Sequence, residues 1–224
     1  MRICFVSKGS LADYTEKYGA AQADVICCGF QSLGNVSYER ELRGETSLFE
    51  DVAILSKEAA NVVVCGCYTD ARGIRRKSVV VAERGRILGV ADMLNRIDGE
   101  EYRSGAGVKI FDTGAGRLGI VCAEDVYFPQ VLQTIALCGA DAALCVFEEL
   151  NDTLEQTVIR AQAFFYGIPV CMCAFGFVQI ADIAGKLRFS SPRCPCVYDL
   201  EREQEYHLVE IRRRGFYRER KNGF

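Results

Sequence analysis

The sequence predicts an α/β fold in which two mixed β-sheets face each other and carry helices on their outer sides. Short β-rich runs alternate with helical stretches along the 224 residues. Two pairs of segments are alike across the two halves of the chain, and hairpin runs place antiparallel strands beside the others. Half of the residues are hydrophobic, which is enough for a sizeable core.

The strand candidates are short runs rich in Val, Ile, Cys and aromatic residues. The run VVVAERGRILGVA predicts a hairpin with Arg84-Gly85 at its turn. The candidates are 2–7, 24–28, 61–67, 78–83, 86–91, 107–112, 117–122, 141–147, 168–173, 177–181 and 206–211.

Two of the three predicted helices are marked by a clear start or end. The first begins near Ser47, where Glu50 completes a capping box. The second covers about 127–138 and ends at Gly139. The side chains expected to face inward are Leu48, Val52 and Leu55 in the first helix and Val131, Ile135 and Cys138 in the second.

The third predicted helix starts at Thr153, has Gln156 in its capping box, and stops at Gly167. Its apolar residues recur at helical spacing, so one face is expected to pack inward. That expected stripe is Leu154, Val158, Ala161 and Phe165.

An internal repeat relates the two halves. The segment AAQADVICCGF resembles LCGADAALCVF, because each has a helix end, Ala-Asp and an apolar strand with cysteine. VVVCGCYTD and IPVCMCAFG form a second matched pair. We therefore expect a pseudo-twofold axis that relates residues 1–116 to 117–224.

Charge and hydropathy exclude several classes of protein. The net charge of −3 does not favour binding to nucleic acid or to an anionic membrane. No apolar run approaches the roughly 20 residues that span a bilayer, and the N-terminal apolar run is too short for a signal peptide. We expect a cytoplasmic protein that does not bind membranes.

Twelve cysteines suggest disulfides, but most of them lie inside apolar runs, where free cysteine packs as a small hydrophobe. In a reducing compartment we expect no disulfides, and we expect buried thiols at five positions. These are Cys4, Cys27, Cys65, Cys145 and Cys171. Cys194 and Cys196 have polar surroundings, but the only histidine is His207 and the spacing of a zinc site is absent, so no metal is predicted.

The stretch GRLGIVCAEDVYFPQ carries the strongest chemical signal. An apolar run ends in Cys122, and Glu124 and Asp125 follow within three residues. A helix N-terminus after the strand lowers the pKa of a thiol and offers N–H groups to an oxyanion. The alternatives are a packed core sulfur, and acids that complement the dipole of the following helix.

The segment FDTGAGRLGIVCAEDVYFPQVLQTIALCGADAALC resembles the nucleophile segment of the carbon–nitrogen hydrolase (nitrilase) superfamily. AAQADVICC, RKSVVVAERGRILG and VIRAQAFFYGIPVCMCAFG resemble other segments of the family, so the likeness spans nearly the whole chain. It implies one domain over 1–224 with a four-layer αββα sandwich. It also implies an amide-like or nitrile-like small-molecule ligand, a homodimer, and no cofactor.

The family's chemistry uses a cysteine nucleophile, a glutamate base and an oxyanion-stabilising lysine. The resemblance aligns Cys122 with the nucleophile. It aligns Phe30 with the glutamate and Met93 with the lysine, and these side chains can neither take a proton nor hold charge. The family's second glutamate has a counterpart in Glu100 or Glu101, which also suit a solvated loop.

Several other charged residues are candidates for the missing roles. Glu124 is a candidate proton handler, and Arg96 lies only three residues after Met93. Lys77 is a candidate cation, although with Arg76 it also suits the charged start of a hairpin. Two further carboxylates, Glu39 and Glu41, follow the Phe30 position by about ten residues and would have to fold back from a loop.

Two functions therefore remain open. The first is a carbon–nitrogen hydrolase with an altered site, whose amide or nitrile hydrolysis is weak, atypical or absent. The second is a non-catalytic protein of the same fold that binds a ligand or a partner subunit. A reactive thiol for redox sensing is a third alternative.

Overall fold

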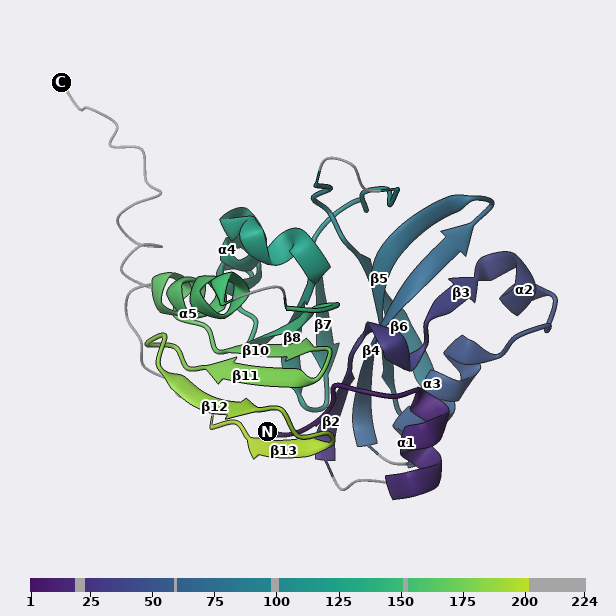
Figure 1. The fold of residues 1–224 in the computed structure, drawn as a ribbon, viewed down its shortest axis with the longest axis horizontal. Helices are drawn as coiled ribbons and strands as arrows, with labels where there is room; N and C mark the ends of the chain where they lie inside the picture. The colour runs from purple at the N-terminus through teal and green to yellow at the C-terminus, as the bar shows by residue number, and fades with distance from the viewer. Residues whose placement is uncertain (19–22, 59, 98–100, 151–152, 202–224) are drawn as a thin grey trace.

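The computed structural model describes residues 1–18, 23–58, 60–97, 101–150 and 153–201 (Figure 1). Two mixed sheets face each other, which confirms the α/β class and the αββα sandwich. The first sheet contains β1 (Arg2–Val6), β2 (Ala23–Cys28), β3 (Asn35–Ser37), β4 (Ala60–Ala71), β5 (Ile74–Glu83), β6 (Arg86–Asp92) and β13 (Cys196–Asp199). The second contains β7 (Lys109–Thr113), β8 (Gly116–Cys122), β9 (Ala142–Val146), β10 (Val170–Ala174), β11 (Phe177–Ala181) and β12 (Leu187–Ser191).

The order of the strands repeats between the two sheets. The first sheet runs β13-β1-β2-β4-β5-β6, with β3 beside β4, and the second, read in the matching direction, runs β7-β8-β9-β10-β11-β12. In both sheets the central strands are parallel and the flanking pairs are antiparallel. The matched sequence pairs therefore fall on equivalent strands, β2 with β9 and β4 with β10. The predicted boundary after residue 116 is wrong, because β7 pairs with β8 in the second sheet.

The helices cover the outer faces of the two sheets (Figure 1). The α-helices are α1 (Leu11–Tyr18), α2 (Tyr38–Leu42), α3 (Leu48–Glu58), α4 (Pro129–Leu137) and α5 (Leu154–Tyr166), and two short 3₁₀ turns are η1 (Phe30–Ser32) and η2 (Ala123–Tyr127). The helices α4 and α5 pack on the second sheet, whereas α1 and α3 pack on the first. No helix in the described ranges is long and apolar enough to cross a bilayer.

The predicted start of α3 is right, but its cap is different. Both oxygens of the Glu41 carboxylate accept hydrogen bonds from the first turn, from the N–H groups of Leu48 and Phe49 at 3.1 Å each. A carboxylate at a helix N-terminus satisfies the unpaired donors there and complements the dipole. Ser47 hydrogen bonds to the Asp51 carboxylate instead of forming the predicted capping box.

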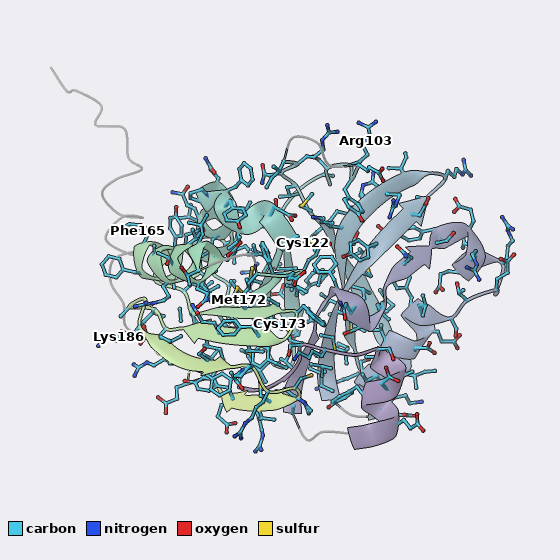
Figure 2. The ribbon with its side chains drawn as sticks, in the orientation of Figure 1. Arg103, Cys122, Phe165, Met172, Cys173 and Lys186 are labelled. Atoms are coloured by element: carbon cyan, nitrogen blue, oxygen red, sulfur yellow. The ribbon has the colours of Figure 1, made fainter. Side chains whose placement is uncertain are left out.

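The predicted stripe of α5 is wrong. The helix buries Glu155, Ile159, Gln162 and Ala163, and it exposes Leu154 and Phe165. Figure 2 shows Phe165 on the outer side of α5, away from the sheets. The buried polar pair has partners in η2: the Tyr127 hydroxyl donates to Glu155, and the Gln162 amide donates to the Val126 carbonyl. The spacing of the apolar residues therefore does not decide which face of α5 is buried, because polar side chains that have hydrogen-bond partners can be buried as well.

All twelve thiols are free, and nine of them are buried. The predicted burial of Cys4, Cys27, Cys65, Cys145 and Cys171 is confirmed. Cys138 was expected to face inward but is exposed, because α4 ends one residue before it. The candidate strand 206–211 and His207 lie outside the described residues.

Candidate active site

Cys122 lies at the carboxyl end of β8, between the two sheets (Figure 2). Only 2 % of the residue is exposed. Burial, and secondarily the nearby Asp125 carboxylate, raises the pKa of its thiol well above the ordinary value. The next residue, Ala123, has a φ of 48°, a left-handed conformation that costs a non-glycine residue about 1–3 kcal/mol. The strand therefore ends in a sharp turn that is typical of functional sites.

Phe30 and Met93 belong to the same inter-sheet core cluster as Cys122. Phe30 starts η1, directly after β2, and its ring lies 5.3 Å from that of Tyr68. Met93 follows β6 and is fully buried. The two residues that the resemblance aligns with the family's glutamate and lysine thus lie in the same interior region as Cys122, where they fill space with apolar side chains.

Lys77, one of the candidate cations, is a buried member of the site. The residue lies near the start of β5 but is only 3 % exposed, so the charged start of a hairpin does not explain its place. Its Nζ lies 2.7 Å from Glu124 Oε1 and 2.6 Å from Glu148 Oε2. The Tyr102 ring centroid is 5.3 Å from the same nitrogen. A buried ammonium group is stable only with such compensation, so the two carboxylates hold its charge in place.

The two acids after Cys122 both make tertiary contacts. Glu124 binds Lys77 through one oxygen, and its other oxygen is buried without a hydrogen-bond partner among the described residues. Asp125 accepts hydrogen bonds from the backbone N–H groups of Leu94 and Asn95. Burial raises the pKa of Asp125, and these bonds oppose the rise. Complementing the dipole of α4 does not explain these acids, because that helix begins only at Pro129.

The other predicted candidates lie elsewhere. Arg96 is exposed, and Glu101 is exposed in an ion pair with Arg75 at 3.0 Å. Glu39 accepts a hydrogen bond from the Arg72 N–H, and Glu41 caps α3. Glu100 lies outside the described residues.

Three functional candidates were missed by sequence reasoning: Tyr68, Tyr102 and Glu148. The Tyr68 hydroxyl donates a hydrogen bond to Glu148, and its ring stacks on that of Tyr102. A signal for Glu148 existed in the sequence. It follows the end of a strand that is parallel to the Cys122 strand, and the carboxyl ends of parallel strands meet at one edge.

A cavity of about 330 Å³ adjoins the charged cluster. Its lining residues are Ile97, Glu124, Tyr127, Phe147, Glu148 and Glu149. Its volume falls within the range of small-molecule sites. Cys122 is not among the lining residues, so the cavity reaches the carboxylates but not the thiol. Within the described ranges, no group of three or more His, Cys, Asp or Glu side chains is arranged to hold a metal ion.

Comparison with known proteins bears on the family. No family model matches the sequence. A probable nitrilase of Schizosaccharomyces pombe is 24% identical over 191 residues, which cover 81% of this chain and 70% of that protein.

Solved structures of an amidase from Nesterenkonia sp. AN1 share the fold. One has a TM-score of 0.74 at 16% identity and covers 95% of this chain and 96% of the amidase. A mutant of that amidase, with acrylamide added at its active-site cysteine, has the same TM-score, identity and coverage. The sequence is thus similar to that of a probable nitrilase, and the fold is that of an amidase from the nitrilase superfamily.

Proposed function

We propose that this chain is a carbon–nitrogen hydrolase-like protein, one domain over 1–224, whose hydrolysis of amides and nitriles is weak, atypical or absent. One observation carries the proposal. Cys122 has the nucleophile's place at the end of its strand, but its thiol is buried beside the apolar side chains of Phe30 and Met93.

The expected weakness follows from the state of the thiol. The thiolate is the nucleophile, and burial raises the pKa of Cys122 so that the neutral thiol dominates at neutral pH. The apolar side chains of Phe30 and Met93 offer neither a proton acceptor nor a charge. Removal of a single oxyanion donor costs about 10²–10³ in rate. The loss of a base would add to that cost.

The second candidate is non-catalytic binding of a ligand or a partner subunit. The cavity beside Glu124 and Glu148 supports it, because a small amide-like molecule can enter without reaching Cys122. Carboxylate oxygens there would accept hydrogen bonds from its amide N–H groups. We also propose a cytoplasmic homodimer, which rests on the family resemblance and is tested by light scattering of the purified protein.

The test is hydrolysis of a broad panel of small amides and nitriles, followed by ammonia release. We expect turnover far below the typical 1–10³ s⁻¹, and we expect it to disappear in Cys122→Ala. Turnover in the typical range that disappears in Cys122→Ala would overturn the proposal. Binding of panel members without turnover, unchanged in Cys122→Ala, would support the non-catalytic candidate.

A further inference from the structure

The buried ammonium group of Lys77 lies on the strand next to Met93. The Met93 N–H donates to the Lys77 carbonyl at 2.9 Å, and the adjoining pair Ser78 and Asp92 is in register across β5 and β6. Residues opposite each other on antiparallel strands project on the same side of the sheet. Met93 belongs to the inter-sheet cluster, so Lys77 enters the same interior region from the neighbouring strand.

Glu124 links this lysine to the nucleophile's strand. It lies two residues after Cys122, and its Oε1 is 2.7 Å from Lys77 Nζ. Its Oε2 is buried and has no hydrogen-bond partner among the described residues. A buried carboxylate oxygen without a partner is costly, and it is able to accept a proton or an N–H group.

We propose that Lys77 replaces the cation lost at Met93 and that Glu124 replaces the proton acceptor lost at Phe30. This inference rests on the proposed function, because it assigns residues to whatever reaction Cys122 performs. The burial of the thiol, which the cavity does not reach, then keeps that reaction weak. Glu148 acts as a positioning residue: it binds Lys77 at 2.6 Å and accepts a hydrogen bond from the Tyr68 hydroxyl. The positive charge thus comes from Lys77 on β5, and the proton acceptor comes from Glu124 in the turn after Cys122.

The chemical step balances with these groups alone. The thiol proton of Cys122 passes to Glu124 while sulfur forms a bond to the amide carbon. The C=O electron pair moves onto oxygen, and the Lys77 ammonium stabilises the negative charge. The C–N bond then breaks, the leaving nitrogen takes the proton from Glu124, and a thioester remains on Cys122. Water hydrolyses that thioester, its proton passing through Glu124 back to sulfur.

The sharpest test moves the lysine across the two strands. Acrylamide adds to a thiolate by a Michael reaction in which charge develops on the carbonyl oxygen, so its rate reports on both the cation and the proton acceptor. Iodoacetamide develops no such charge and reports mainly on the thiolate. The adducts at Cys122 are quantified by peptide mass spectrometry in folded wild type, Lys77→Met, Lys77→Met/Met93→Lys and Glu124→Gln.

We expect Lys77→Met to slow acrylamide addition by about 10²-fold, with a smaller effect on iodoacetamide. The double variant with Met93→Lys should restore most of the rate. Glu124→Gln should slow both reagents. Arg86→Met, which removes an exposed charge from the adjacent strand β6, is the matched control and should change neither rate.

Unfolding in urea establishes that each variant is folded. Lys77→Met/Glu148→Gln, which also removes the charge of a carboxylate that binds the lysine, replaces Lys77→Met if that variant does not fold. Unchanged acrylamide addition in a folded variant without Lys77, or a folded double variant that restores nothing, would overturn the inference, as would a wild-type Cys122 that does not react. If Cys122 labelling depends on Lys77 but no amide is hydrolysed, only the proposed hydrolysis is contradicted. If amides are hydrolysed at a rate that Lys77→Met does not change, only this inference is contradicted.

Discussion

Cys122 lies opposite Val146 on the parallel strands β8 and β9. Glu124 and Glu148, each two residues further along, both bind Lys77. The two strands of the second sheet therefore deliver their carboxylates to one lysine of the first sheet. This contact connects the sheets at the edge where the strand of Cys122 ends.

Removal of the lysine should destabilise the protein strongly. Lys77→Met leaves two carboxylates without their buried counter-charge, which costs about 3–5 kcal/mol in comparable buried pairs. Urea unfolding measures the loss. Additional replacement of Glu124 and Glu148 by Gln should recover part of it, since these two side chains then carry no charge. An equally unstable triple variant would mean that lost packing, and not charge, sets the cost.

Asp125 should hold the segment after β6 against the turn that follows Cys122. Asp125→Ala leaves the N–H groups of the half-buried Leu94 and Asn95 without their acceptor, and each lost hydrogen bond costs about 0.5–1.5 kcal/mol. The free energy of unfolding should fall accordingly. Asp112→Ala is the control, because that carboxylate is exposed and should change stability by no more than about 0.5 kcal/mol. Equal effects of the two substitutions would contradict this role.

Gly66 should be required for the packing of Phe30. A Cβ at this position would lie 2.9 Å from the Phe30 Cα and N and from Val146 Cγ1. Gly66→Ala should therefore cost about 1–3 kcal/mol through overpacking. Gly107→Ala is the matched control, since nothing lies within 4 Å of a Cβ there. A Gly66→Ala protein as stable as this control would show that the backbone of η1 is free to move away.

Stability should decline above about pH 9. Burial raises the pKa of Cys4 from 9.0 to about 11 and raises those of Cys145 and Cys171 in the same direction. Above 9.0 these thiols ionise in the unfolded chain but stay neutral in the folded protein, so unfolding releases protons and becomes easier as the pH rises. Thermal unfolding from about pH 7 to about pH 10 measures the slope, which Cys145→Ala should reduce and Cys138→Ala should not. A flat profile would contradict the burial of these thiols.

The sequence predicts the sheets better than the charged site. The matched pairs of segments on β2 and β9 and on β4 and β10 are local patterns, and the fold preserves them. The inward face of α5 cannot be predicted from the sequence of the helix alone, because Glu155 and Gln162 are buried through partners in η2. Lys77 was a candidate cation, but the charged start of a hairpin was an open alternative for the same reason. Its partner Glu148 comes from the other sheet, and only the folded chain brings them together.

The most direct test of the central claim is the alkylation rate of Cys122 as a function of pH, with Cys138 as an internal reference. Cys138 is exposed, so iodoacetamide reaches it in the folded protein, whereas Cys122 is buried with a raised pKa. We expect Cys122 to react far more slowly than Cys138 at neutral pH, and we expect its rate to keep rising as the pH increases beyond about 9. A Cys122 that reacts as fast as Cys138 at neutral pH, at a rate independent of pH, would contain a thiolate and contradict a weakly reactive site.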